Sequence, residues 1–218
     1  MKKVILHLCA DLGSDSYPYA CDDDYRVIKI GQSYGVENLT KTSLLRDFDI
    51  NCVQGIIANP VCTDLSRARR GGQPKNVENG LFLVNHCLRI VKELQPKWWV
   101  LENPASGALR DILGKPKMTY QPYEYGSGWT KNTALWGDFR QPEKTHTWET
   151  CPKIEGLYIR KRGNRKSRDD KPSLAFQHKN HIRFIKEFEP FIGFVETDAD
   201  LRSLCSQHFA AAFKAVNP

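Results

Sequence analysis

Two short apolar runs, each ending at an Asn-Pro pair, constrain this chain more than any other feature. Residues 53–58 (VQGIIA) lead into Asn59-Pro60-Val61-Cys62, and residues 98–101 (WWVL) lead into Glu102-Asn103-Pro104. Short apolar runs that stop at turn residues are typical of buried strands, so each pair predicts a turn at a strand end. The Cys62 thiol and the Glu102 carboxyl could then share one rim of a sheet, as a nucleophile and an acid.

The remaining apolar pattern predicts a doubly wound α/β fold of the Rossmann-like kind. Residues 4–8 and 27–30 are two further strand-like runs, and residues 79–94 have helical spacing that stops at Gln95-Pro96. Strands that alternate with helices favour parallel pairing, with ligands bound beyond the carboxyl ends of the strands. Residues 200–215 are predicted to form one closing helix.

Composition indicates an ordinary globular chain with a basic surface. The 218 residues carry 32 Lys and Arg against 25 Asp and Glu, a net charge of +7, which favours a polyanionic partner such as nucleic acid. No apolar run approaches a membrane span, and we interpret the start of the chain as a first strand rather than a signal peptide. The seven scattered cysteines suggest reduced thiols, so we expect a cytoplasmic protein.

The apolar periodicity ends after residue 137, which predicts three segments. We expect a catalytic core at 1–137, a small irregular basic insertion at 138–181 for recognition, and a C-terminal segment at 182–218 that returns to the core. Basic side chains in two places are expected to contact phosphates. These are Arg67, Arg69 and Arg70 after the Cys62 loop, and Arg160, Lys161, Arg162, Arg165, Lys166 and Arg168 in the insertion.

The order of these elements resembles the DNA cytosine C5-methyltransferase family, and most of all its short, phage-type members. The resemblance covers most of residues 4–137 and the C-terminal helix. It implies that Cys62 is the nucleophile, that Glu102 and Asn103 form the Glu-Asn pair of the site, and that Lys131 lies beside the target base. It also implies that S-adenosylmethionine is held by Cys9, Ala10, Asp11, Leu12 and Gly13, together with Asn59 and Pro60.

The resemblance implies methyl transfer from S-adenosylmethionine to C5 of cytosine in DNA. Cys62 would add to C6 of the base while Glu102 hydrogen-bonds N3, which makes C5 nucleophilic. The partner would be double-stranded DNA whose target cytosine is flipped out of the helix. No metal is expected, because the histidines and cysteines of the second half of the chain fit no common zinc spacing.

Three departures from the family pattern leave other functions open. Val61 stands where the family has proline, Asp11 replaces a glycine of the cofactor loop, and Gly31 replaces an acidic residue after the second strand. The first alternative is therefore a catalytically inactive relative that binds DNA or a protein partner. The second alternative keeps the fold but takes RNA or free nucleotides as substrate.

Overall fold

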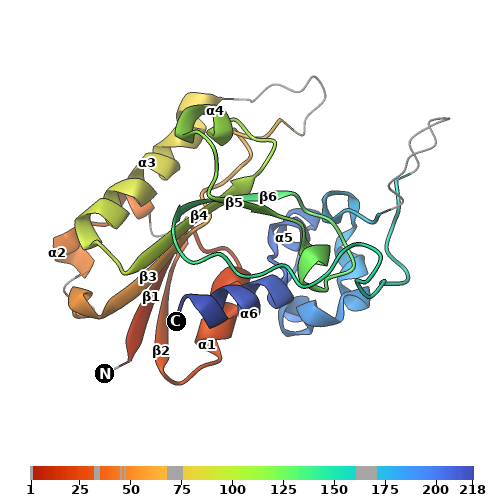
Figure 1. Cartoon of the computed structure of the whole chain (residues 1–218). Helices are drawn as coiled ribbons and strands as arrows, with labels where there is room; N and C mark the ends of the chain where they lie inside the picture. Colours follow the sequence, from red (N-terminus) through yellow and green to blue (C-terminus); the bar gives the residue numbers. More distant parts are fainter. Residues whose placement is uncertain (1, 32–34, 45, 47, 68–75, 161–170) are drawn as a thin grey trace.

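A six-stranded mixed sheet forms the centre of the molecule (Figure 1). The computed structural model describes residues 2–31, 35–44, 46, 48–67, 76–160 and 171–218. The strand order is β2-β1-β3-β4-β6-β5, in which the first four strands run parallel and β6 is antiparallel to both of its neighbours. The strands are β1 (Lys3–Leu8), β2 (Tyr25–Ile30), β3 (Val53–Ala58), β4 (Trp98–Pro104), β5 (Met118–Tyr120) and β6 (Thr133–Asp138).

The predicted α/β class and all four predicted strands are confirmed. The parallel pairing expected of these four strands is also confirmed. The turn predicted at Glu102-Asn103-Pro104 is wrong, because β4 continues to Pro104 and these residues pair with β6. The sheet has two further strands at one edge. There β6 lies between β4 and β5 and pairs antiparallel with both, because the chain enters it from the loop that follows β5 instead of from a crossover helix.

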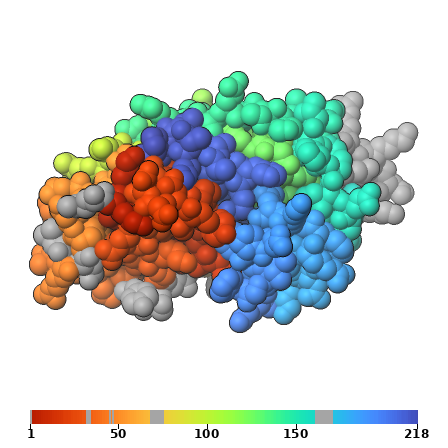
Figure 2. Space-filling model, turned by 90° about the horizontal axis from the view of Figure 1, so that it is seen from below, coloured from red at the N-terminus to blue at the C-terminus, as the bar shows by residue number. Residues whose placement is uncertain are grey.

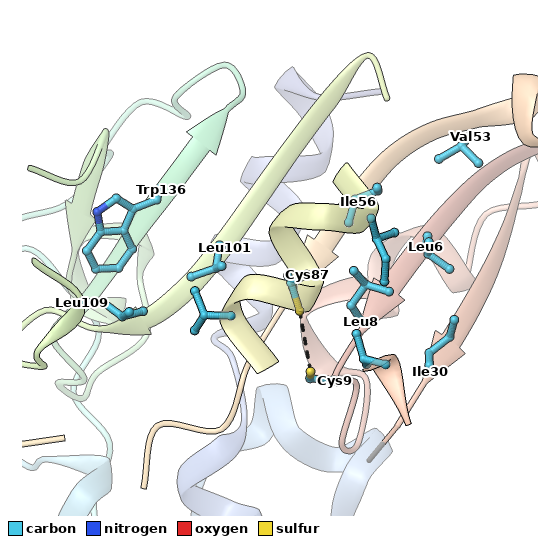
Figure 3. Close-up of a cluster of buried hydrophobic side chains, with 14 of the residues drawn as sticks. Leu6, Leu8, Cys9, Ile30, Val53, Ile56, Cys87, Leu101, Leu109 and Trp136 are labelled. Atoms are coloured by element: carbon cyan, nitrogen blue, oxygen red, sulfur yellow. Dashed lines mark hydrogen bonds between the residues drawn. The ribbon is translucent and has the colours of Figure 1, made fainter. Parts of the chain in front are cut away.

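Helix α3 (Val77–Leu94) covers one face of the sheet and begins two residues before the predicted helix. The Asn76 side chain caps it by accepting a hydrogen bond from the backbone N–H of Asn79. Val84, Cys87 and Ile90 recur at helical spacing and are buried against the inward-facing residues of β1 and β3 (Figure 3).

Helices α1 (Tyr17–Ala20) and α6 (Gln207–Val216) cover the opposite face, so the two ends of the chain meet there. Phe209 and Phe213 of α6 belong to the same buried cluster as Trp98 and Val100 of β4. The Tyr19 hydroxyl donates to the backbone carbonyl of Asn217 at 2.7 Å. This face is therefore closed by segments from opposite ends of the sequence.

The single closing helix predicted at 200–215 is wrong, because the chain forms two helices there. Helix α5 (Asp198–Ser203) ends at Leu204, whose backbone is extended, and α6 begins after Ser206. The Ser206 hydroxyl accepts the backbone N–H of Phe209 at 3.1 Å, which starts the second helix. Leu204 is buried among the small 3₁₀ helices, whereas Phe209 is buried against the sheet, so one straight helix could not serve both clusters.

A third buried cluster lies beside the sheet and defines what we call the small lobe, residues 148–160 and 171–204. Its core draws Trp129 from the sheet side and Leu174, Phe188 and Leu204 from the lobe itself. Figure 2 shows the lobe in light blue next to the red N-terminal segment. The short elements not yet named are η1 (Ser14–Ser16), η3 (Val36–Asn38), α2 (Lys41–Leu44), η4 (Ile50–Cys52), α4 (Leu109–Leu113), η5 (Pro122–Tyr125), η6 (Leu174–Phe176), η7 (Lys179–Phe184) and η8 (Lys186–Phe194).

Across the ranges given above, none of the helices combines the length and apolar character needed to span a bilayer.

Gly55 in β3 provides a test of this packing. A Cβ at this position would overlap the indole ring of Trp98, which is itself buried in the second cluster. We expect Gly55→Ala to lower the free energy of unfolding by about 1–3 kcal/mol, measured by urea denaturation. The matched control is Gly193→Ala, since a Cβ there meets nothing within 4 Å; it should stay within about 0.5 kcal/mol of wild type. Equal stability of the two variants would contradict the packing described here.

Candidate active site

The register of three parallel strands brings polar side chains together at one rim of the sheet. His7 of β1 pairs with Ile57 of β3, which in turn pairs with Val100 of β4. Side chains alternate between the faces of a strand, so His7 projects to the same face as Asn59 and Glu102, which follow Ile57 and Val100 by two residues each. This is the face that α6 covers.

These side chains form a continuous hydrogen-bonded series, which we call the polar chain: Ser16, His7, Asn59 and Glu102. His7 is only 1% exposed, and its Nδ1 lies 2.8 Å from the Ser16 hydroxyl. Its Nε2 lies 2.7 Å from Oδ1 of Asn59. The Asn59 amide nitrogen donates to Oε2 of Glu102 at 3.5 Å. The four side chains come from η1, β1, the loop after β3, and β4, so these hydrogen bonds join four segments at one site.

Burial changes the protonation of both titratable groups in the polar chain. It lowers the pKa of His7, and the neutral imidazole has one nitrogen that donates and one that accepts. Burial also raises the pKa of Glu102; the Lys131 charge and the Asn59 hydrogen bond oppose this rise, while Asp15 adds to it. Glu102 is therefore better able to retain a proton than an exposed glutamate.

A small cavity lies against Glu102, between the sheet and α6. Its volume is about 20 Å³, which is enough for roughly one water molecule. Asp15, Glu102 and Cys205 supply its polar atoms and sulfur, and the rest of its lining is apolar. The apolar lining consists of Ile57, Val100, Leu135, Phe209, Ala210 and Phe213.

Cys62 lies half-buried on the loop that leaves β3. Its backbone carbonyl accepts the N–H groups of Leu65 at 3.0 Å and Ser66 at 2.7 Å, which closes a tight turn around the thiol. Burial raises the pKa of Cys62 and the nearby Glu102 charge raises it further, whereas Lys131 lowers it. The Cys62 thiol therefore lies within the electrostatic field of the Glu102 carboxyl.

Asn103 and Glu102 point to opposite faces of β4, although they are neighbours in sequence. The Asn103 side chain is fully buried, and its amide nitrogen donates to the carbonyl of Pro60 at 3.0 Å. This hydrogen bond fixes the start of the loop that carries Cys62. Its own Oδ1 atom is buried without a hydrogen-bond partner.

Lys131 connects this rim to the small lobe. Its ammonium group donates to the carbonyls of Ser203 at 3.1 Å and Leu204 at 3.2 Å, at the end of α5. Its charge lowers the pKa of both Glu102 and Cys62. Lys131 is therefore a fixed positive charge beside the two candidate catalytic groups.

The loop predicted to hold a cofactor has two residues in left-handed backbone conformation. Gly13 has φ 75°, and Cys9 has φ 53°, which is uncommon for a residue with a side chain. Cys9 and Ala10 are buried, and the Cys9 sulfur lies 3.8 Å from that of Cys87 in the core (Figure 3). Leu12 packs on the small lobe. Of the five loop residues, only Asp11 presents an exposed side chain at the rim.

Negative charge gathers around Asp11. Partial burial raises the pKa of the Asp11 carboxyl, and the charges of Asp15 and Asp200 raise it further. Asn59 and Pro60, also predicted to hold a cofactor, instead interact with the neighbouring strands. Asn59 belongs to the polar chain, and Pro60 accepts the hydrogen bond from Asn103.

The basic residues predicted to contact DNA are only partly described. Arg67 is exposed and pairs with Asp111, and Arg160 lies with its guanidinium 4.8 Å from the ring centre of Phe176. The others lie outside the described residues: Arg69, Arg70, Lys161, Arg162, Arg165, Lys166 and Arg168.

Sequence reasoning missed His7, Asp15 and Ser16 as members of this site. The one available signal was His7 itself, a polar residue inside the apolar run at 4–8. Over the described ranges, no three His, Cys, Asp or Glu side chains are grouped so that they could hold a metal ion.

Comparison with known proteins identifies a viral relative of this chain. The chain is 28% identical over 172 residues to a "Probable DNA (cytosine-5)-methyltransferase" of Frog virus 3 (isolate Goorha), over 66% of this chain and 76% of that protein. The predicted resemblance to this family is confirmed by that match. No family model matches the chain.

Among solved structures, the chain is similar to a "putative DNA modification methyltransferase encoded within prophage" from E. coli. The two share 16% identity with a TM-score of 0.43, over 62% of this chain and 46% of that one. The chain thus spans less than half the length of that structure.

Glu102→Gln provides a test of the buried carboxyl. Because burial raises the pKa of Glu102 above its ordinary value of 4.5, the folded state holds this proton more tightly than the unfolded state. Its contribution to stability is therefore present at low pH and is lost as the pH rises through the folded-state pKa. Glutamine does not titrate, so Glu102→Gln should gain stability relative to wild type between pH 4 and pH 8 in urea denaturation.

The control for this comparison is Glu155→Gln, an exposed carboxylate of the small lobe. It should remain within about 0.5 kcal/mol of wild type at both pH values. A difference between Glu102→Gln and wild type that does not change with pH would contradict a raised pKa at Glu102.

Proposed function

We propose that this chain transfers a methyl group from S-adenosylmethionine to C5 of cytosine in DNA, through a covalent adduct with Cys62. The observation that carries the proposal is the pairing of the Cys62 thiol with the Glu102 carboxyl, each within reach of the charge of Lys131. A thiol and a proton-holding carboxyl are the two groups needed to add a nucleophile to a pyrimidine ring. The name of the Frog virus 3 relative supports the same reaction.

The first step assigned to this chain activates the base. Carbon 5 of cytosine is a weak nucleophile. Cys62, as the thiolate, would form a bond to C6, and the electron pair of the C5–C6 double bond would shift towards C5. Glu102 would hold a proton at N3, which lowers the energy of the negative charge that the addition puts into the ring.

The last step restores the aromatic ring. When bound, S-adenosylmethionine supplies an electrophilic methyl group. After the methyl group is transferred, the cofactor would leave as its neutral thioether and the N3 proton would return to Glu102. The C5 proton would pass to water, its electron pair would restore the C5–C6 double bond, and the bond between Cys62 and C6 would break to give back the thiolate. Cys62 is therefore unchanged at the end of the reaction.

The residues at the rim suit the cationic part of this cofactor. S-adenosylmethionine carries a sulfonium and an ammonium group, and the carboxylates of Asp11 and Asp15 make this edge of the sheet negative. The buried Oε1 of Gln207, which has no hydrogen-bond partner, offers an acceptor at the start of α6. We therefore expect Asp11, Asp15 and Gln207 to bind the cofactor.

DNA is the proposed substrate, and its target base would have to leave the duplex to reach Cys62. Extruding a nucleotide costs a few kcal/mol, which phosphate contacts from a basic protein can offset. The net charge of +7 supports such contacts, with Arg67 and Arg160 as the described candidates.

One observation favours the alternative of a catalytically inactive relative that binds DNA or a protein partner. Burial and Glu102 both raise the pKa of Cys62, so the thiol is mostly protonated at neutral pH, whereas addition to C6 requires the thiolate. If the chain is an enzyme, the rate of transfer should therefore rise with pH as Cys62 loses its proton, and fall again at a pH where Glu102 no longer holds its own.

The direct test is transfer of a radiolabelled methyl group from S-adenosylmethionine to unmethylated duplex DNA. Cys62→Ala should lower the rate by roughly 10³-fold or more, because it removes the sulfur that would add to C6. The matched control is Cys21→Ala, which removes an exposed thiol outside the site and should transfer at the wild-type rate.

Duplex DNA that contains 5-fluorocytosine tests the adduct itself. Fluorine at C5 cannot leave as a proton, so wild type with cofactor should remain attached to the DNA in denaturing gels, and Cys62→Ala should not. Transfer retained by Cys62→Ala would refute the covalent mechanism. Folded wild-type protein that neither transfers nor traps would favour the inactive alternative.

A further inference from the structure

The side-chain amide of Asn59 lies between a histidine and a carboxyl, and its orientation decides what each neighbour receives. One end of the amide accepts a hydrogen bond and the other donates. In the structure its Oδ1 faces Nε2 of His7 at 2.7 Å, and its Nδ2 faces Oε2 of Glu102 at 3.5 Å. Amide orientation follows from the hydrogen-bond network, so the donor state of His7 governs it.

The neighbours of His7 select its donor state. Nε2 of His7 faces Oδ1 of Asn59, which can only accept, so this contact requires the proton to be on Nε2. The Ser16 hydroxyl lies 2.8 Å from Nδ1 and 3.2 Å from the carbonyl of Gly13, and it can donate to either of these acceptors. When the Ser16 hydroxyl donates to Nδ1, the proton of the neutral imidazole is on Nε2 and points at Asn59. The opposite tautomer would turn the Asn59 oxygen towards Glu102, which is unfavourable whenever that carboxyl is ionised.

We propose that His7 and Asn59 are positioning residues for Glu102: the His7 Nε2–H fixes the Asn59 amide, whose NH₂ group then holds Oε2 and leaves Oε1 to carry the proton for the target base. Among the described residues, Glu102 has no other side-chain hydrogen bond. The inference rests on the proposed function, since it assigns a place to the proton that Glu102 would hold at N3.

The geometry explains why such an anchor is needed. The two oxygens of a carboxyl are equivalent until one is held, and the group can rotate about its last bond. A misplacement of about 1 Å in an active site costs on the order of 10²-fold in rate. His7 belongs to β1 and is hydrogen-bonded to Ser16 of η1, so the position of its imidazole is fixed by the sheet. The imidazole can therefore fix the position of the Asn59 side chain at the rim.

The charges around the polar chain do not replace this anchor. Asp15 and Lys29 face His7, and Lys131 and Asp15 face Glu102. Cys62 and Tyr120 also lie within the field of the Glu102 charge. Lys131 and Asp15 change the pKa of the carboxyl, but among the described residues only Asn59 donates a hydrogen bond to it.

The test compares three variants in the methyl-transfer assay. His7→Gln keeps an N–H donor near the place of Nε2 and should keep kcat within about 3-fold of wild type. His7→Leu removes the donor, and Asn59→Asp keeps the shape but removes the NH₂ group; both should lower kcat by roughly 10- to 100-fold, with KM for DNA unchanged. Urea denaturation of each variant shows whether it is folded under assay conditions.

The pattern among these variants decides the outcome. Equal loss in His7→Gln and His7→Leu would overturn the proposal, because a structural role does not depend on the donor. A change in KM with kcat unchanged would also overturn it. If His7→Leu matches wild type while wild type transfers normally, the inference fails and the proposed function stands.

A second measurement does not depend on activity. Ring ¹⁵N shifts of the histidine-labelled wild-type protein, with His7 assigned by the signal lost in His7→Gln, report which nitrogen carries the proton. We expect Nε2–H and an unprotonated Nδ1 near pH 7. An Nδ1–H tautomer would overturn the inference even in an active enzyme. Absence of transfer by wild type, with the expected tautomer, would refute the proposed function and leave the amide orientation established.

Discussion

The backbone pairing of β1, β3 and β4 is the constraint on which the candidate site depends. Because β3 pairs with both outer strands in parallel register, the last residues of all three strands end at one rim. A shift of one residue in β1 would move His7 to the α3 face, into a cluster of apolar side chains. The apolar residues that alternate along these strands therefore determine the position of the polar ones.

The polar chain is stable because its members satisfy one another. A buried polar group left without a partner costs about 1–3 kcal/mol, whereas a hydrogen bond that is made contributes about 1 kcal/mol. His7 remains neutral, because burial lowers its pKa, and it meets a hydroxyl on one side and an amide on the other. The polar residues most deeply placed in the sheet thus carry no charge, and the charges lie at the rim, on Asp11, Asp15 and Lys131.

The small lobe is attached to this rim by specific hydrogen bonds. Glu187 accepts from the Trp129 indole at 2.9 Å and from the backbone N–H of Gln207 at 2.7 Å, so it joins the lobe to both the sheet side and α6. Lys131 makes a second connection through the carbonyls at the end of α5. The lobe is therefore hydrogen-bonded to the residue whose charge acts on both Glu102 and Cys62. The division of the chain at residues 137 and 181 remains our proposal.

Much of this protein follows from its sequence alone, where the determinants are local. Strands β1 to β4, helix α3 and the position of Cys62 after a strand could be predicted, because apolar periodicity and Asn-Pro turns depend on adjacent residues. The continuation of β4 through Glu102 to Pro104 could not be, because pairing with β6 decides it. The break between α5 and α6 and the antiparallel β6 could not be, because burial in two separate clusters and pairing with a distant strand decide them.

The polar chain also belongs to the tertiary structure: His7 meets Ser16 nine residues away and Asn59 fifty-two residues away, and Asn59 meets Glu102 forty-three residues away. From the sequence His7 is only a polar residue in an apolar strand. Strand register, a property of the whole sheet, makes it a partner of the candidate catalytic acid.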